Sequence, residues 1–241
     1  MASQKTVLVT GGAVRIGAEI CRTFANVGWQ VAIHCRNSVQ EARKLVAELG
    51  DCASVFHADL TDKEERDELI PAVIARLGRL DALVNNASVY HRRPLAKCDD
   101  TTLAEDFDIN FIAPFQLMRQ FHNHAEHGVI VNLLDCRVEW VDAGAGTYAL
   151  AKKALRDATE AAALEWAPDI RVNAVAPGLT LPPPGVDPEK MKPLIKNIPM
   201  KKPSPPEEVA EACRFLAEAD TITGQIIHVD GGLHLPIPHT P

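Results

Sequence analysis

Short apolar runs rich in β-branched residues alternate with amphipathic helical stretches along nearly the whole chain. The first unit has a strand-like run at 5–10, glycines directly after it, and a helical face carrying Ile16, Ile20 and Phe24. The same alternation predicts further strands at 29–33, 53–57, 81–85, 129–134, 170–175 and 225–229, and further helices at 39–49, 62–76, 103–123, 147–166 and 206–218. This order predicts an α/β fold in which a mostly parallel, doubly wound sheet lies between two helical layers.

Length and composition favour one large core. The chain has 241 residues, 46% of them hydrophobic, and no linker divides it, so 1–241 is expected to be a single domain. The net charge of -7 argues against nucleic acid and anionic membranes as partners. No apolar run approaches the ~20 residues that span a bilayer. Six widely spaced cysteines, without CxxC or a signal-like N-terminus, indicate reduced thiols and a cytoplasmic protein.

Residues 181–206 break the alternation, because they hold nine of the 17 prolines. They predict an irregular loop with one short helix near 188–197. Ligands bind at the carboxyl ends of parallel strands, and this loop follows such an end, so it is expected to cover the substrate. A proline-stiffened surface loop without a role is the alternative.

The turn after the first strand reads Thr10-Gly11-Gly12-Ala13-Val14-Arg15-Ile16-Gly17. Small residues there let the backbone approach a pyrophosphate, and the helix N-terminus offers unpaired N–H groups. The turn therefore indicates a dinucleotide site. A glycine turn that only packs the strand on the helix is the alternative.

The end of the second strand selects between the two nicotinamide dinucleotides. It reads Ile33-His34-Cys35-Arg36-Asn37-Ser38, with no acid before Glu41. An acid would accept from the ribose hydroxyl, whereas Arg36 with Asn37 and Ser38 suits a 2′-phosphate. We therefore predict NADPH as the cofactor, with a solvated loop charge at Arg36 as the alternative.

Tyr148 and Lys152 stand four residues apart in a helical stretch, so both side chains lie on one face. A nearby ammonium favours the phenolate and lowers the tyrosine pKa, which suits proton transfer near neutral pH. The spacing is frequent in helices, so the pair gains weight only together with other motifs.

Several of these motifs occur together in one protein family. In order and spacing the chain resembles the short-chain dehydrogenase/reductase family at Thr10-Gly11, Gly17, Asn85-Asn86-Ala87, Asn110, Tyr148, Lys152 and Pro177-Gly178. The resemblance covers essentially the whole chain. It implies a three-layer Rossmann-type fold and an oxidoreductase.

The resemblance also implies residue roles. Tyr148 is then the proton donor, Lys152 binds the nicotinamide ribose, and Asn110 supports a water relay to Lys152. Asp59 contacts adenine and Asn85, with neighbouring main chain, holds the adenosine; helix capping and strand-end hydrogen bonding are the alternatives. The cofactor-binding residues expected are Gly11, Arg15, Ile16, His34, Arg36, Asn37, Ser38, Asp59, Leu60, Asn86, Ala87, Ser88, Tyr148, Lys152, Pro177 and Gly178.

Three positions depart from the common family pattern. Arg15 replaces the middle glycine of TGxxxGxG, Ser88 replaces the glycine of NNAG, and Asp135 stands thirteen residues before Tyr148, where a serine is expected. Together these replacements resemble the pteridine reductase branch, which includes bacterial dihydromonapterin reductase-like enzymes. The stretch that starts at His34 is similar to that branch as well.

A pterin substrate explains the replacements chemically. Its reducible bond is C=N, so a hydride from NADPH must be matched by a proton on a ring nitrogen. A carboxyl at Asp135 can hold and relay that proton, whereas a serine suits a ketone. The resemblance implies that Tyr90 stacks on the pterin; an ordinary loop aromatic is the alternative. The substrate-binding residues expected are Arg15, Ser88, Tyr90, Asp135 and Tyr148, and the catalytic residues expected are Asp135, Tyr148, Lys152 and Asn110.

We expect NADPH-dependent reduction of a dihydropterin to its tetrahydro form. The alternatives are a carbonyl reductase of the same family, acting on a 3-oxoacyl thioester or small ketone, and a non-catalytic NADPH-binding regulator. No metal site is expected at His122, His124 and His127, which lack an acidic or cysteine partner. The resemblance implies a homotetramer with helices 103–123 and 147–166 at dimer interfaces, and the partly apolar tail 235–241 is expected against a neighbouring subunit.

Overall fold

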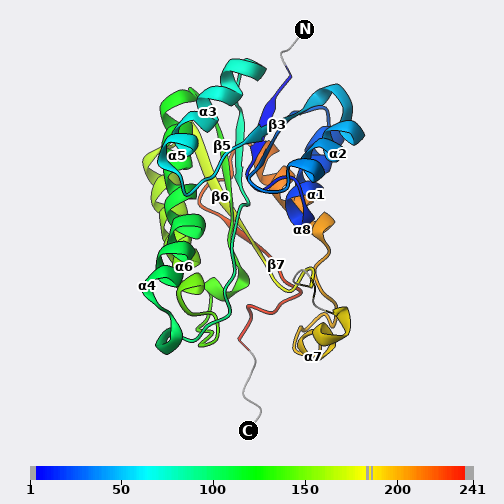
Figure 1. Ribbon diagram of the computed structural model, residues 1–241, viewed down its shortest axis with the longest axis vertical. Coiled ribbons are helices and arrows are strands. Elements are labelled where there is room, and N and C mark those ends of the chain that lie inside the picture. Colours follow the sequence, from blue (N-terminus) through cyan, green and yellow to red (C-terminus); the bar gives the residue numbers. More distant parts are fainter. Residues whose placement is uncertain (1–3, 183–184, 186, 237–241) are drawn as a thin grey trace.

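The computed structural model describes residues 4–182, 185 and 187–236 (Figure 1). One sheet contains its strands in the order β3-β2-β1-β4-β5-β6-β7, and every neighbouring pair is parallel. The strands are β1 Thr6–Val9, β2 Gln30–Cys35, β3 Ala53–His57, β4 Ala82–Asn85, β5 Gly128–Leu133, β6 Ile170–Pro177 and β7 Ile226–Val229. The predicted doubly wound α/β sheet is confirmed.

Helices cover both faces of the sheet, with α1, α2 and α8 on one and α3 to α6 on the other (Figure 1). Alternate residues of β1 serve the two layers: Val7 and Val9 pack in the core with α1 and α8, and Leu8 packs in the core with α3 and α5. Strands buried on both faces must be apolar throughout, which explains their continuous Val, Ile and Leu runs. The helices are α1 Arg15–Asn26, α2 Val39–Leu49, α3 Lys63–Leu77, α4 Asp100–Phe107, α5 Ala113–His124, α6 Gly146–Glu165, α7 Lys192–Ile195 and α8 Pro206–Glu218.

The helix predicted at 103–123 contains a π turn. α4 ends at Phe107, a π turn occupies Asp108–Ile112, and α5 begins at Ala113. Pro114, in the first turn of α5, has no N–H, so the carbonyl of Asn110 four residues earlier has no α-helical donor. The predicted helix is therefore confirmed, and the π turn within it is the feature that the sequence did not predict.

The described part of segment 181–206 contains the short turn Pro188–Met191 and α7, in agreement with the helix expected near 188–197. Pro183, Pro184 and Val186 of this segment lie outside the described residues, as do residues 237–241 of the tail expected at a subunit contact. Among the described helices, none combines the length and apolar character needed to span a bilayer.

The strand order reverses at β1, which pairs with β2 on one side and β4 on the other. The connections after β1 and β4 therefore leave for opposite faces of the sheet and open a crevice between the carboxyl ends of these strands. The residues that follow β1, β2 and β4 converge on this crevice, although they are distant in sequence.

Asn85, the last residue of β4, points its side chain into a buried polar network. Its Nδ2 donates to Oδ1 of Asn132 on β5 at 2.9 Å, and Asn132 Nδ2 donates to the Thr159 hydroxyl of α6 at 2.9 Å. Asn85 and Asn132 are almost fully buried. The Asn85 side chain therefore makes strand-end hydrogen bonds inside the protein.

This network predicts a stability effect at Asn132. In Asn132→Ala the buried Asn85 amide loses its nearest acceptor, and we expect the free energy of unfolding to fall by about 2 kcal/mol. Urea denaturation measures the loss, with the exposed Asn123→Ala at the end of α5 as the control. Equal stabilities for the two variants would contradict the prediction.

Candidate active site

A cavity of about 400 Å³ opens at the crevice between β1 and β4. Ten of the predicted cofactor-binding residues line it: Gly11, Arg15, Ile16, His34, Arg36, Asn37, Leu60, Asn86, Ala87 and Ser88. Val14, Gly17, Val89 and Ile109 complete the lining. Of these four, Gly17 belongs to the glycine motif, whereas Val89 and Ile109 are ordinary apolar residues that no sequence signal distinguishes.

The other six predicted cofactor residues do not line this cavity. Ser38 precedes α2, Asp59 follows β3, and Tyr148 and Lys152 lie on α6. Pro177 ends β6 and is followed by Gly178, where an added Cβ would lie 2.7 Å from the Cβ of Asp230. The close packing beside Asp230 is thus a structural reason for this glycine.

The glycine turn has no space for side chains where it meets the loop after β4. An added Cβ at Gly17 would lie 2.2 Å from the Gly11 carbonyl oxygen and 2.6 Å from Asn86 Nδ2. The same Nδ2 donates to the carbonyl oxygens of Thr10 at 2.9 Å and Gly11 at 3.1 Å. Asn86 therefore holds the turn in shape from within the protein.

Arg15 departs from the glycine pattern at a position that still has a glycine-like backbone. Its φ is 57°, in the left-handed region that favours glycine. Its guanidinium donates to the carbonyl oxygens of Pro182 at 2.9 Å and Leu181 at 3.3 Å. Arg15 thus joins the glycine turn to the beginning of the proline-rich segment.

His34 lines the cavity, but both of its ring nitrogens are used inside the protein. Nδ1 accepts from the Gly11 N–H at 3.1 Å, which leaves the proton on Nε2 for the Ala58 carbonyl oxygen at 3.0 Å. Burial lowers the pKa of His34 to about 4, so the ring is neutral at physiological pH. His34 therefore positions the glycine turn.

Arg36 and Asp59 form an ion pair across the ends of β2 and β3. Arg36 Nε lies 2.9 Å from Asp59 Oδ2, and the Arg36 side chain is 53% exposed. Partial burial opposes ionisation of Asp59, but the hydroxyl and amide of Thr61 and the charge of Arg36 outweigh it and lower the Asp59 pKa. Capping of α3 belongs to Asp62, whose side chain accepts from the Glu65 N–H.

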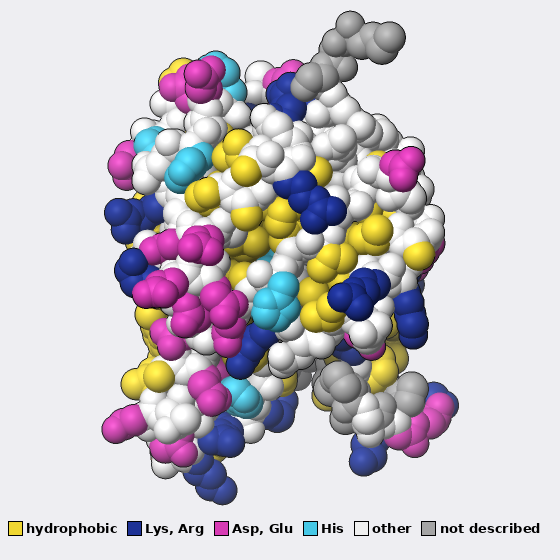
Figure 2. Space-filling view, turned by 45° about the horizontal axis from the view of Figure 1, so that its top comes forward, with side chains coloured by type: hydrophobic (Ala, Val, Ile, Leu, Met, Phe, Trp, Pro, Cys, Tyr) yellow, Lys and Arg dark blue, Asp and Glu magenta, His cyan; other side chains and the backbone are white. Residues whose placement is uncertain are grey.

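Charge is unevenly spread on the face shown in Figure 2. The largest group of Asp and Glu side chains lies on the left, and apolar side chains run through the middle of this face with Lys and Arg among them.

Tyr148 and Asp135 are in direct contact, as the thirteen-residue interval of the family pattern leads one to expect. The Tyr148 hydroxyl donates to Asp135 Oδ2 at 3.1 Å. Burial, reinforced by the Asp135 charge, raises the pKa of Tyr148 well above its ordinary value. The expectation that Lys152 lowers the pKa of Tyr148 was wrong, because burial and the Asp135 charge raise this pKa.

Lys152 is almost fully buried, and its ammonium donates to the Leu133 carbonyl oxygen at 2.7 Å. Burial lowers the pKa of Lys152 to about 8. The ammonium is therefore fixed at the end of β5, one helical turn from Tyr148.

Asn110 holds the loop after β4 through its side chain. Its Oδ1 accepts from the Ser88 hydroxyl at 2.6 Å, and its Nδ2 donates to the Val89 carbonyl oxygen at 3.0 Å. The side chain is thus committed to protein contacts, while Pro114 leaves its main-chain carbonyl without an α-helical donor.

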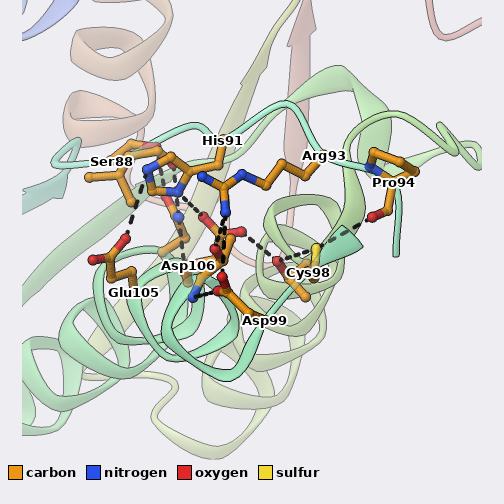
Figure 3. A network of polar contacts seen from close by, with 12 residues as sticks. Ser88, His91, Arg93, Pro94, Cys98, Asp99, Glu105 and Asp106 are labelled. Atoms are coloured by element: carbon orange, nitrogen blue, oxygen red, sulfur yellow. Dashed lines mark hydrogen bonds and ion pairs between the residues drawn. The ribbon is translucent and has the colours of Figure 1, made fainter. Parts of the chain in front are cut away.

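Asp106 is a central residue that the sequence did not reveal. Its buried carboxylate contacts His91 Nδ1 at 3.0 Å and accepts from the Thr147 hydroxyl at 2.5 Å (Figure 3). His91 belongs to the loop after β4, and Thr147 directly precedes Tyr148. Asp106 therefore joins that loop to the start of α6, but nothing distinguishes it from the other acids of α4 in the sequence.

Tyr90 lies against the Tyr148 ring. Its ring centroid lies 4.8 Å from that of Tyr148 in an edge-on arrangement, and the residue is 40% exposed. Arg137, which the sequence reading did not include, lies against both Tyr90 and Asp135. Its position two residues after Asp135 is the signal that could have found it.

Comparison with known proteins identifies the family. Residues 12–234 match the family model described as Enoyl-(Acyl carrier protein) reductase. The chain belongs to the short-chain dehydrogenase/reductase family. Pteridine reductase 1 of Leishmania tarentolae is 31% identical over 95% of this chain and 96% of its own. The 3-oxoacyl-[acyl-carrier-protein] reductase FabG of Staphylococcus aureus is 30% identical over 98% of this chain and 100% of its own.

A solved structure shares the fold of this short-chain dehydrogenase/reductase closely. FolM alternative dihydrofolate reductase 1 from Brucella canis, described as complexed with NADP, superposes with a TM-score of 0.93. It is 34% identical and the alignment covers 100% of this chain and 99% of that one. The relatives therefore include both pterin or folate reductases and carbonyl reductases.

The neutral state of His34 predicts a pH-dependent stability. The ordinary histidine pKa is 6.5 and the folded value is about 4, so the unfolded chain binds the extra proton more readily and stability falls as the pH falls from 6.5 to 4. His34→Gln removes this titration and should reduce that fall by about 3 kcal/mol. Urea denaturation across this pH range measures it, with the exposed His127→Gln as the control. Parallel curves for wild type and His34→Gln would contradict the assignment.

Proposed function

We propose that the chain is an NADPH-dependent reductase that converts a dihydropterin to a tetrahydropterin. The observation that carries the proposal is the carboxylate of Asp135 at 3.1 Å from the Tyr148 hydroxyl, at the position where the family pattern has a serine. Support comes from the similarity to a pteridine reductase and to a FolM alternative dihydrofolate reductase.

The cavity fits a dinucleotide with a 2′-phosphate. Gly11, Arg15 and Ile16 line the cavity at the start of α1, and the N-terminus of a helix suits a pyrophosphate. The exposed Arg36 guanidinium beside Asn37 suits the 2′-phosphate. NADP is also the ligand named for the Brucella FolM structure. When bound, the cofactor supplies the hydride. We assign Lys152 to its nicotinamide ribose and propose Ser38, Asp59, Pro177 and Gly178 as further contacts.

Protonation of the substrate nitrogen is assigned to Tyr148. Its raised pKa keeps the hydroxyl protonated at neutral pH, as a proton donor requires. Asp135 accepts the hydrogen bond from this hydroxyl and so orients it. An acceptor carboxylate suits a ring that carries N–H groups, whereas the serine of ketone reductases polarises a carbonyl oxygen by donating to it.

The proposed pterin-binding residues surround the proton donor. Arg15 and Ser88 line the cofactor cavity, and Tyr90 contacts the Tyr148 ring edge. A flat heterocycle held between Tyr90 and the nicotinamide would present its C=N bond to Tyr148. Asn110 is proposed to support the proton relay through its main-chain carbonyl.

The proposed assembly is a cytoplasmic homotetramer of one-domain subunits, with 181–206 covering the substrate. It rests on the family resemblance and on exposed apolar side chains of α6, namely Leu150 at 47% and Leu164 at 86% exposure. A monomer mass in light scattering would contradict the tetramer.

The first test compares substrate classes by following NADPH oxidation. We expect turnover of dihydromonapterin, dihydrobiopterin or dihydrofolate, competitive inhibition by methotrexate, and slower or no turnover of an acetoacetyl thioester. Turnover of carbonyl compounds alone would contradict the pterin proposal and favour the 3-oxoacyl alternative. Tight NADPH binding without any turnover would favour a non-catalytic regulator.

The role of Asp135 is tested by replacing it with serine, the residue that the family pattern has at this position. In Asp135→Ser we expect kcat for the pterin to fall about 100-fold, because the tyrosine loses its orienting acceptor. The dissociation constant for NADPH should stay within about twofold, since Asp135 does not line the cofactor cavity. Full pterin turnover by this variant would remove Asp135 from the mechanism.

The role of Arg36 is tested by cofactor preference. Arg36→Leu should raise KM for NADPH about 30-fold, the equivalent of about 2 kcal/mol, because one charge-assisted contact to the 2′-phosphate is lost. KM for NADH, which has no such phosphate, should change little. Arg43→Leu, at an exposed position on α2, is the control. Equal wild-type efficiency with NADPH and NADH would contradict the assignment.

A further inference from the structure

Arg137 lies in the short turn Cys136–Val138 after β5 and holds both oxygens of the Asp135 carboxylate. Its Nη1 donates to Asp135 Oδ2 at 2.8 Å, and its main-chain N–H donates to Asp135 Oδ1 at 2.9 Å. Oδ2 is also the oxygen that accepts from Tyr148. The direction of the acceptor that faces the proton donor is therefore set by Arg137.

The guanidinium is itself anchored from the other side. Arg137 Nε donates to Asp142 Oδ2 at 2.9 Å, and Asp142 Oδ1 accepts from the Gly144 N–H at 2.8 Å. Only 25% of the Arg137 side chain is exposed. Two carboxylates in this partly buried position require the cation between them, because their mutual repulsion is otherwise uncompensated.

The same guanidinium packs on the ring of Tyr90. Its central carbon lies 5.3 Å from the centroid of the Tyr90 ring, within cation–π range. The Tyr90 ring in turn meets the Tyr148 ring at 4.8 Å. Arg137 thus touches the acceptor carboxylate and the aromatic contact at once.

The charge of Arg137 also acts on the proton donor. Burial and Asp135 raise the pKa of Tyr148, and Arg137 is the nearby charge that lowers it. Without Arg137, Asp135 would make Tyr148 a weaker acid and would be free to turn toward water.

We propose that Arg137 is a positioning residue of the reductase: it fixes the Asp135 carboxylate toward Tyr148 and holds Tyr90 in place, so that one side chain aligns the proton donor with the substrate-stacking wall. The proposal rests on the proposed function in one respect: it takes Asp135, Tyr148 and Tyr90 as the site of the reaction. It adds a residue that neither the family motif nor the cavity lining contains.

The test compares Arg137→Gln, Arg137→Lys and Arg137→Ala with Arg156→Gln as a matched control. Arg156 donates to the carbonyl oxygen of Val138, in the same turn, at 3.0 Å, and Lys153 donates to that oxygen as well, so the turn stays anchored in the control. Arg156 belongs to neither the proposed catalytic nor the binding residues. Thermal melting of each variant identifies any loss of folding.

We expect Arg137→Gln to lower kcat about 100-fold and to raise KM for the substrate, with KM for NADPH within about twofold, because the proton donor and the wall are misaligned while the cofactor cavity is intact. Arg137→Lys should recover part of the activity, since an ammonium reaches one carboxylate but has no planar fork for two. Millimolar methylguanidinium should rescue Arg137→Ala and leave Arg156→Gln unchanged. A merely structural role would not produce rescue by a small cation.

The proposal is overturned if Arg137→Gln keeps kcat within about threefold of wild type, or if Arg156→Gln loses as much. It is also overturned if methylguanidinium rescues nothing in a folded Arg137→Ala. The variants are assayed with whichever substrate class the wild type reduces. If the wild type reduces carbonyl compounds and no pterin, the proposed function is overturned, but the variants still test the positioning role of Arg137. A wild type without any turnover overturns both.

Discussion

The contact between Gly17 and the Gly11 carbonyl is the constraint on which the site depends. There is no space for a Cβ at Gly17, so α1 begins directly against the turn that leaves β1. The turn is then held by protein groups alone, with Asn86 donating to its carbonyls and His34 accepting from its N–H. A preorganised turn costs no ordering when a pyrophosphate binds, which is why buried, neutral side chains serve it.

The second half of the site depends on buried charges that are paired locally. Asp135 meets Arg137 and Tyr148, while Asp106 meets Thr147 and the loop after β4. Asp106 joins α4 to the loop after β4 and to α6, and Asp135 joins the loop after β5 to α6, so the start of α6 is fixed from two sides. The cost of burying a carboxylate is offset by these partners, and loss of any one partner leaves a charge unsatisfied.

The sequence led to most of the fold and to much of the site. The alternation of apolar runs and amphipathic helices predicted the sheet, because strands buried on both faces need continuous apolar runs. The family motifs found the glycine turn and Asp135, which follow the ends of β1 and β5, and Tyr148 in the first turn of α6. These patterns missed the π turn at Asp108–Ile112 and the residues Asp106 and Arg137, whose types are common on solvated loops and helices. Asp106 is distinguished only by partners from other segments, whereas Arg137 has a local signal in its position two residues after Asp135.

Residue identities by themselves determined the parallel sheet, the glycine turn and which side chains could exchange a proton. Tertiary structure alone decided their states: burial makes His34 neutral and keeps Tyr148 protonated, and the folded chain places Arg36 on Asp59 and Arg137 between two carboxylates. The physical reason is that propensity and periodicity are local properties of the chain. A pKa depends on desolvation in the folded core, and the Arg36–Asp59 ion pair joins the ends of two strands, so both exist only after the sheet has formed.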